Sequence, residues 1–504
     1  MNCETALAEI TEILASSSEW LIIHASGKSF ALQNREIEIT PERGKIILGF
    51  LDEKGFQLWR VAGYKIEEEL LILDVTRSFG REQDEIKFVP RISAGELSAA
   101  VELARLEKAN RLARLIIAEN PQSKLIRVAL NKENGRFATI IFALPTKKQI
   151  AVLSDVSGGA TPENLLTTAI LWLSKLGTRR KHPIAAIWIL AEPKLSGNLR
   201  KLHALLKENW KSRITIREIS RENAKSQNNR ITEKRTLAIK DLWRGQASKI
   251  SLPETTELTR TAAEITKLAP DKIDVIFSKH GETVRFCGLP FARVRRIGAA
   301  EKCWFGIERD RRILNEQTRP EFFDLIENLK THRRSDAPNQ RHEFYRLAPE
   351  AWLEAILRRD INLLDNNLIL SPIHHQFRTG GDRIDLLALR KDGRLIVIEI
   401  KTSPDREMIF QAADYWRKIE LQRRGGSLQK AQIFGELEIA DQPTLVFLVA
   451  PTLSFHYHFE FLANTIAPEI EIYRFDLNEN WRENLKVMRI EKIPNRVLFT
   501  DEHK

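Results

Sequence analysis

The chain has 504 residues, of which 43% are hydrophobic and 29% charged. That length is too great for one hydrophobic core, and the composition is typical of folded globular protein, not of a disordered chain. No apolar run reaches the roughly 18–20 residues needed to span a bilayer, and the acidic N-terminal residues do not fit a signal peptide. We therefore expect a multidomain protein without a membrane segment.

Charge and cysteine content narrow the class of protein further. The sequence has 3 cysteines and no CxxC pair, so neither a disulfide framework nor a cysteine-ligated zinc site is expected. This usage favours a reducing, cytoplasmic location. The formal net charge is +11, and a basic surface attracts polyanions such as nucleic acid. Charge alone is a weak argument, because many basic proteins bind no nucleic acid.

Five regions follow one another along the chain. Short apolar runs between turn residues predict a small β-rich domain, a barrel or a sandwich, over residues 1–94. Helical and strand patterns then alternate over residues 95–219 and predict an α/β domain. Residues 220–239 are polar and charged, as in a linker. A mixed α+β region is expected over residues 240–345, and a second α/β domain over residues 346–504.

The clearest chemical signal is the stretch RIDLLALRKDGRLIVIEIKTS at residues 383–403. Side chains alternate along a strand, so Glu399 and Lys401 share one face. A two-residue Asp-Gly turn would place Asp385 on the opposite face. A three-residue Lys-Asp-Gly loop with a left-handed glycine pairs Asp385 with Glu399 instead. The sequence therefore predicts that these three charged groups converge.

Two carboxylates one strand spacing apart repel each other, and burying them unpaired costs free energy. A divalent cation removes both costs, and hard oxygen ligands suit Mg²⁺ or Mn²⁺. Lys401 could then hold an attacking water or offset charge on a phosphate. For the ExK triplet alone, the alternative is a surface hairpin in which Lys401 pairs with Glu399 or Asp385.

Two predicted helices flank this hairpin. One begins near Pro404 and carries Gln411 and Tyr415 four residues apart, on one face. The other precedes the hairpin and carries Glu354 near its inward edge, from where the carboxylate could reach a metal through water. Glu350, one turn earlier, is the competing candidate.

These motifs, together with QAADYW, resemble the PD-(D/E)XK nuclease superfamily, in particular its RecB-like branch with a Q-x-x-x-Y helix. The segment of about residues 350–420 is similar to the catalytic domain of the NucS (EndoMS) DNA endonucleases, whereas residues 1–345 show no such counterpart. The resemblance implies a restriction-endonuclease-like αβββαβ core with a mixed sheet. It also implies metal ligands at Asp385, Glu399 and the Ile400 carbonyl, a catalytic Lys401, an auxiliary acid at Glu354, and Gln411 and Tyr415 beside them or on nucleic acid.

Residues 331–346 mix arginines with aromatic side chains directly before this domain. Arg333, Arg334 and Arg341 are predicted to contact phosphates. The alternative for such a basic cluster is a solvated helix end.

The elements expected over residues 95–219 follow the same order as those of the C-terminal domain. Placing LSDVS over IEIKTS sets Asp155 against Glu399 and Ser157 against Lys401. An inactive nuclease-like domain is one hypothesis, and a Rossmann-like module is the simpler one.

The sequence as a whole predicts a Mg²⁺- or Mn²⁺-dependent nuclease that hydrolyses phosphodiester bonds. By analogy with the family, a DNA endonuclease is favoured over an enzyme acting on RNA. The alternative is a non-catalytic nucleic-acid-binding or assembly protein that retains a nuclease-like core. Homodimerisation stays open.

Overall fold

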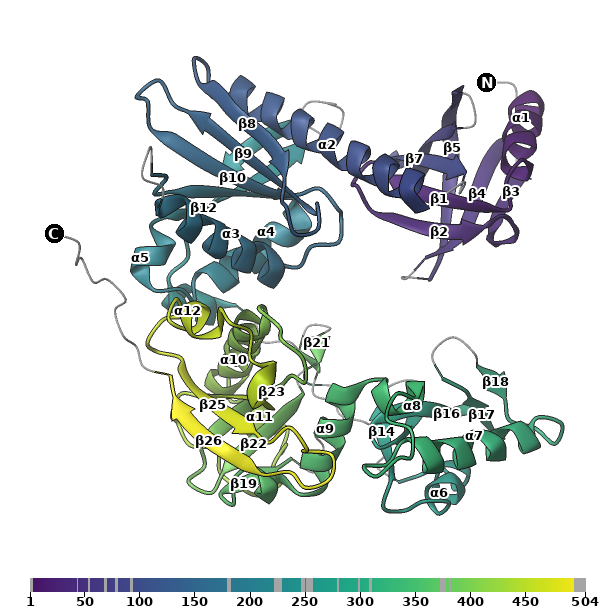
Figure 1. The fold of residues 1–504 in the computed structure, drawn as a ribbon, viewed down its shortest axis with the longest axis vertical. Coiled ribbons are helices and arrows are strands. Elements are labelled where there is room, and N and C mark those ends of the chain that lie inside the picture. Colours follow the sequence, from purple (N-terminus) through teal and green to yellow (C-terminus); the bar gives the residue numbers. More distant parts are fainter. Residues whose placement is uncertain are drawn as a thin grey trace. The chain divides into compact units, whose positions relative to one another are not determined.

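The computed structural model describes residues 3–42, 44–52, 55–67, 70–77, 80–90, 94–178, 183–221, 229–245, 250, 257–278, 281–297, 300–307, 311–371, 378–379, 382–383 and 385–493. The chain divides into two compact units, one of residues 1–203 and 209–236 and the other of residues 204–208 and 237–504. Both units combine helices with sheets (Figure 1). The protein is therefore multidomain and of mixed α/β structure. No helix among the described residues is long and apolar enough to cross a membrane.

The first sheet is antiparallel, with seven strands in the order β2-β1-β7-β6-β5-β4-β3. Helix α1 (Cys3–Ala15), which the sequence patterns did not predict, packs Ala6, Ile10 and Leu14 into the core of this sheet. The region is β-rich as expected, and it forms a single sheet whose edges are β2 and β3. Its other elements are β1 (Glu19–His24), β2 (Ser29–Gln33), η1 (Asn34–Glu36), β3 (Ile37–Glu42), β4 (Lys45–Asp52), β5 (Gly55–Glu67), β6 (Leu70–Arg77) and β7 (Glu82–Pro90).

The second sheet has the order β13-β12-β11-β10-β9-β8. Its neighbours from β8 onward are antiparallel, antiparallel, parallel, parallel and antiparallel, so it is not the parallel sheet of a Rossmann-like module. β13 lies inside the predicted linker 220–239, because Ile231 is buried in the core of this sheet. The elements are α2 (Ala94–Glu119), β8 (Lys124–Leu130), β9 (Phe137–Ala143), β10 (Gln149–Asp155), α3 (Pro162–Gly177), β11 (Ile187–Ala191), α4 (Pro193–His203), α5 (Glu208–Lys211), β12 (Ile214–Arg221) and β13 (Asn229–Glu233).

The third sheet is an antiparallel meander of five strands in chain order, β14 to β18. Helices on either side of it in the chain complete the α+β region predicted for residues 240–345. The elements are η3 (Ile239–Arg244), α6 (Arg260–Thr266), β14 (Ile273–Ser278), β15 (Gly281–Phe286), β16 (Leu289–Ile297), β17 (Ala300–Phe305), β18 (Arg312–Ile313), α7 (Arg319–His332) and α8 (Glu343–Arg346).

The fourth sheet has the order β19-β22-β23-β24-β25-β26. Its neighbours from β19 onward are antiparallel, antiparallel, parallel, parallel and antiparallel, the same succession as in the second sheet. The elements are α9 (Pro349–Arg359), η4 (Ile361–Leu363), β19 (Leu368–Leu370), the short pair β20 (Arg378–Thr379) and β21 (Asp382–Arg383), β22 (Leu386–Arg390), β23 (Leu395–Ile400), α10 (Met408–Arg424), α11 (Ser427–Lys430), β24 (Leu445–Pro451), η6 (Thr452–Ser454), α12 (Phe459–Ala463), β25 (Glu471–Leu477) and β26 (Val487–Lys492).

The third and fourth sheets share one hydrophobic core, to which Phe286, Trp352 and Ile398 all belong. The turn between β15 and β16 approaches α9 so closely that a Cβ atom on Gly288 would collide with the Ala351 carbonyl. The boundary expected near residue 345 is therefore not a boundary between cores, and α9 is fixed by both sheets.

Arg333 binds the main chain that leads into α9 and so fixes the position of this helix. Its side chain is fully buried and lies over the Trp352 ring, 4.7 Å from the centroid. Burial lowers the pKa of this guanidinium to about 10. Its N–H groups donate to main-chain carbonyls on both sides of the junction, those of Phe286, Cys287, Phe344, Leu347 and Ala348.

Replacing Arg333 with Met should lower the free energy of unfolding by about 3 kcal/mol, because several buried carbonyls lose their donors. The neighbouring Arg334→Met is the control, since Arg334 is exposed and pairs with Asp336. Urea unfolding followed by tryptophan fluorescence measures both variants. Coincident unfolding curves for the two would contradict this role of Arg333.

Candidate functional site

The hairpin of β22 and β23 has the register that the sequence predicted. The strands are antiparallel, with Leu389 opposite Leu395. Gly393 adopts a left-handed conformation with φ +82 and closes a three-residue loop. Continuing the register by residue pairs sets Asp385, which directly precedes β22, opposite Glu399.

The two carboxylates project from the face of the sheet that packs on α10. Along β23, Leu395 and Val397 share a cluster with Ile419 of α10, and Glu399 follows at the same two-residue spacing. Asp385 is fixed through its carboxylate, because its Oδ2 accepts a hydrogen bond from the Ile400 amide at 2.9 Å.

The Glu399 carboxylate is buried, and only one of its two oxygens has a partner in the described part of the chain. The residue is 2% exposed, and Oε2 has no hydrogen-bond partner among the described residues. Burial first, and the charge of Asp385 second, raise the pKa of Glu399 well above its usual value, against the opposing influence of Lys401. A buried carboxylate with one free oxygen beside a second acid is a position that a cation would stabilise.

Lys401 supplies one positive charge to this cluster. Its Nζ lies 3.0 Å from Glu399 Oε1 and 3.5 Å from Asp405 Oδ2. Burial alone would lower the pKa of Lys401, but Glu399 and Glu350 raise it overall. The ammonium therefore stays charged, which suits a hydrogen-bond donor and not a general base.

Helix α10 begins at Met408, four residues later than the predicted start at Pro404. The intervening residues form a turn in which Asp405 Oδ1 accepts from the Glu407 amide at 2.6 Å. This turn leaves the other oxygen of Asp405 facing Lys401. The sequence signal for that contact was the spacing of four residues between the two side chains.

Gln411 and Tyr415 lie on α10, as expected. Gln411 Oε1 is buried and has no partner among the described residues, and the same holds for Thr402 Oγ1, which the sequence did not single out. Tyr415 packs against the apolar cluster, with Lys418 Nζ 5.5 Å from its ring centroid. Glu399, Thr402 and Gln411 thus each have one buried oxygen, a hard donor atom, without a hydrogen-bond partner among the described residues.

The two candidate acids on α9 have different surroundings. Glu354 is buried in an ionic network, in which its Oε1 accepts from Arg358 Nε at 2.6 Å and lies 3.6 Å from Arg285 Nη1. Arg358 also donates to the Asp385 carbonyl at 3.1 Å. Glu350 is instead the acid on α9 whose charge acts on both Glu399 and Lys401. Glu354 thus positions the hairpin through Arg358, whereas the negative charge of Glu350 raises the pKa of both Glu399 and Lys401.

The donor set fits a hard divalent cation of the Mg²⁺ type. Such ions keep several waters and take one or two protein carboxylates, and Asp385 and Glu399 provide two. Within the described ranges, no group of three or more His, Cys, Asp or Glu side chains gathers as a metal cage.

Of the three arginines predicted to contact phosphates, one is buried and two are exposed. The prediction is wrong for Arg333, because a fully buried guanidinium bonded to main-chain carbonyls cannot reach a ligand at the surface. Arg334 is exposed and pairs with Asp336, and Arg341 is exposed. For these two residues phosphate contact stays a prediction.

Comparisons with known proteins give little support for a relationship. No protein-family model matches the chain, and no curated protein matches it. Among solved structures, the chain is similar to the apo form of EndoMS at 10% sequence identity, over 37% of this chain and 84% of that chain, with a TM-score of 0.13. A TM-score of this size carries no weight for function.

Glu354→Gln should lower the free energy of unfolding by about 3 kcal/mol, because Arg358 would lose its buried partner. Glu350→Gln is the matched control on the same helix, and we expect little change in stability from it, since Glu350 is only partly buried. Thermal and urea unfolding of the two variants measure the difference. Equal destabilisation would show that Glu354 has no special structural role.

Proposed function

We propose that the C-terminal domain, from residue 346 onward, is a PD-(D/E)XK-type nuclease that hydrolyses phosphodiester bonds of DNA with Mg²⁺ or Mn²⁺. One observation carries the proposal: within the described part of the chain, one oxygen of the buried Glu399 carboxylate has no partner beside Asp385, while Lys401 contacts its other oxygen. Glu354, by contrast, has two arginines beside its Oε1.

The order of elements around these residues supports this assignment. Helix α9, strands β19, β22 and β23, helix α10 and strand β24 follow one another as αβββαβ, within a sheet of mixed direction. This is the order of a restriction-endonuclease-like core. In it, the acids lie where the second and third strands of the core meet.

Each residue then has a defined task. Asp385, Glu399 and the Ile400 carbonyl hold the cation. When bound, the cation supplies a water of lowered pKa and neutralises charge on the scissile phosphate. Lys401, which stays protonated, donates a hydrogen bond to the attacking water or to a phosphate oxygen as negative charge develops.

Residues around the cation complete the site. Glu350 takes the role of auxiliary acid that the resemblance implied for Glu354, because its charge reaches the cluster. Gln411, with its unpartnered Oε1, orients a water or contacts the nucleic acid, and Tyr415 packs beside it on α10. DNA as the substrate rests on the resemblance of the motifs alone.

Lys401→Met should reduce cleavage of DNA by about 100-fold or more, since a donor to developing charge is lost. Asp385→Asn and Glu399→Gln should each abolish the metal-dependent cleavage of DNA. Lys391→Met, at the exposed turn of the same hairpin, is the control and should cleave as the unchanged protein does. A panel of supercoiled, linear, branched and single-stranded substrates, with Mg²⁺, Mn²⁺ or EDTA, measures these rates.

Two outcomes of this assay would contradict the proposal. One is cleavage that persists in EDTA. The other is equal cleavage by Lys401→Met and Lys391→Met. If no substrate is cut under any condition while the protein binds DNA, the non-catalytic alternative is supported.

Metal binding can be tested apart from activity. Mn²⁺ at 100 times its Kd should raise the free energy of unfolding by about 2.7 kcal/mol, seen as a higher midpoint of thermal unfolding. Glu399→Gln should lose this rise, because the replaced carboxylate is a ligand. The same rise in Glu399→Gln and in the unchanged protein would place the bound Mn²⁺ elsewhere.

A further inference from the structure

The second and fourth sheets share one topology. Reading from β8 and from β19, six strands follow in the same order with the same succession of directions. A helix precedes each sheet, α2 or α9, and a long helix follows the third strand, α3 or α10 (Figure 1). Residues 94–233 therefore have the architecture that we assign to the nuclease domain.

Equivalent positions follow from the pairing. On β10, Ile150 and Val152 belong to the core under α2, so Asp155 lies on the opposite face, as Glu399 does on β23. Asp155 pairs with Phe137, just as Glu399 lies opposite Asp385. Phe137 thus stands where the nuclease domain has its second acid.

The chemistry of the nuclease site is missing here. Asp155 Oδ1 accepts from the Ser157 amide at 2.8 Å and from the Ser157 hydroxyl at 2.7 Å, and Oδ2 accepts from the Ala160 amide at 3.2 Å. Both carboxylate oxygens are therefore occupied by the chain itself. With a buried phenylalanine for the second acid and a serine for the lysine, this domain has no set of ligands for a catalytic cation.

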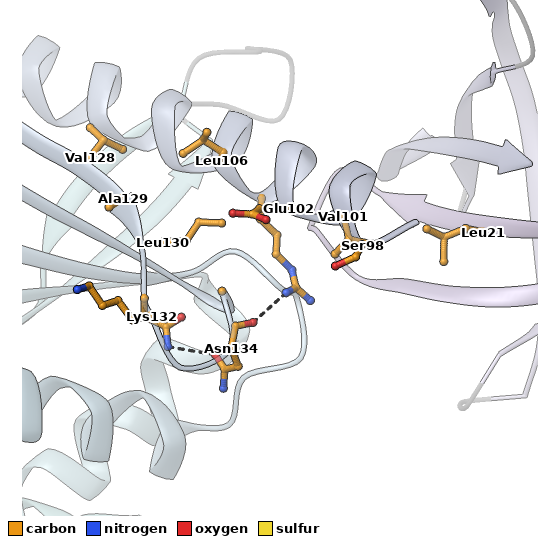
Figure 2. Close-up of a pocket in the computed structure, with 13 residues that line it drawn as sticks. Leu21, Ser98, Val101, Glu102, Leu106, Val128, Ala129, Leu130, Lys132 and Asn134 are labelled. Carbon is orange, nitrogen blue, oxygen red and sulfur yellow. Dashed lines mark hydrogen bonds between the residues drawn. The ribbon is translucent and has the colours of Figure 1, made fainter. Parts of the chain in front are cut away.

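A cavity of about 850 Å³ lies on the α2 face of this sheet, between α2 and the loop from Asn131 to Gly135. Figure 2 shows Lys132 and Asn134 on that loop, opposite the residues of α2. Arg105 of α2 lines the cavity, donates through Nη1 to the Asn134 carbonyl at 3.3 Å, and keeps a buried Nε without a partner in the described chain.

A second cavity of about 770 Å³ lies along the same helix. Lys108, Arg111 and Arg114 of α2 line it together with Arg230 of β13 and with two acids, Glu119 and Glu192. Lys108 donates to the Ser26 carbonyl at 2.8 Å and lies 3.4 Å from Glu192.

The arginines of this second cavity are available to a ligand. Arg111, Arg114 and Arg230 are exposed and form no ion pair with any residue in the described ranges. Of the acids on α2, Glu107 lies 3.6 Å from Lys87 and Glu119 accepts from the Ile231 amide. Glu102 lines the first cavity together with Arg105. The charges of Arg111, Arg114 and Arg230 are therefore available to a bound anion.

The basic side chains of α2 form a continuous row. Arg105, Lys108, Arg111 and Arg114 recur every three residues, and such residues make a ridge that crosses a helix obliquely. This row joins the first cavity to the second. A row of positively charged side chains suits the regularly spaced phosphates of a nucleic acid strand, and the two cavities beside the row offer space for its bases.

We propose that residues 94–233 are an inactive second nuclease-type domain that binds the phosphate backbone of nucleic acid along Arg105, Lys108, Arg111 and Arg114. The description of this domain as an inactive copy rests on the function proposed above. The binding itself does not, because it needs neither metal nor cleavage.

The test uses the full chain carrying Lys401→Met, in EDTA, and the anisotropy of fluorescein-labelled 20-nucleotide single-stranded and duplex DNA. Arg105→Gln, Arg111→Gln and Arg114→Gln together should weaken binding by about 10-fold or more. They should also make the plot of log affinity against log salt less steep by about 2–3. The control removes three exposed charges at the far end of the same sheet, by Lys124→Gln, Lys147→Gln and Lys148→Gln.

Equal affinities and equal salt slopes for the two triple variants would overturn the proposal. Because Arg105 is partly buried, Arg111→Gln with Arg114→Gln is measured as well; both positions are exposed, so a folding defect is not expected there. A loss of binding in this pair supports the proposal even if the triple variant is unstable. Failure of the cleavage assay would leave these binding results standing, and failure here would leave the nuclease proposal standing.

Discussion

The buried carboxylate of Glu399 beside Asp385 is the constraint on which the C-terminal domain depends. Two acids placed opposite each other in a sheet repel, and burial removes the water that would otherwise screen them. Lys401 lies 3.0 Å from one oxygen of Glu399, and the other oxygen has no hydrogen-bond partner among the described residues. The hairpin register, the left-handed Gly393 and the amide of Ile400 on Asp385 all maintain this costly arrangement.

Two buried charged residues, Arg333 and Glu354, fix the scaffold around the hairpin. Arg333 is bonded to five carbonyls, and Glu354 to two arginines. Through Arg358, Glu354 also holds the main chain at Asp385. These contacts fix the main chain around the hairpin, whereas Glu399 Oε2 has no hydrogen-bond partner among the described residues.

The hairpin could be predicted from the sequence because its determinants are local. Strand alternation and the Lys-Asp-Gly loop set the register, and they place Asp385 opposite Glu399 without reference to other parts of the chain. The burial of Arg333 depends on its contact with Phe286 at the end of β15, tens of residues away in the sequence, so no local pattern reveals it. Glu354 has a local partner, Arg358 four residues later, but its second arginine, Arg285, is equally distant in the sequence. The same holds for β13, whose polar sequence resembles a linker although Ile231 fills the core of its sheet.

The most direct measurement of the central claim is anomalous X-ray diffraction from crystals grown with Mn²⁺. The account predicts an anomalous peak about 2.1 Å from Glu399 Oε2 and from a carboxylate oxygen of Asp385, the distance typical of Mg²⁺-type sites. It is contradicted if ordered density shows Mn²⁺ bound elsewhere on the chain while the space between these two carboxylates holds only the Lys401 ammonium or water.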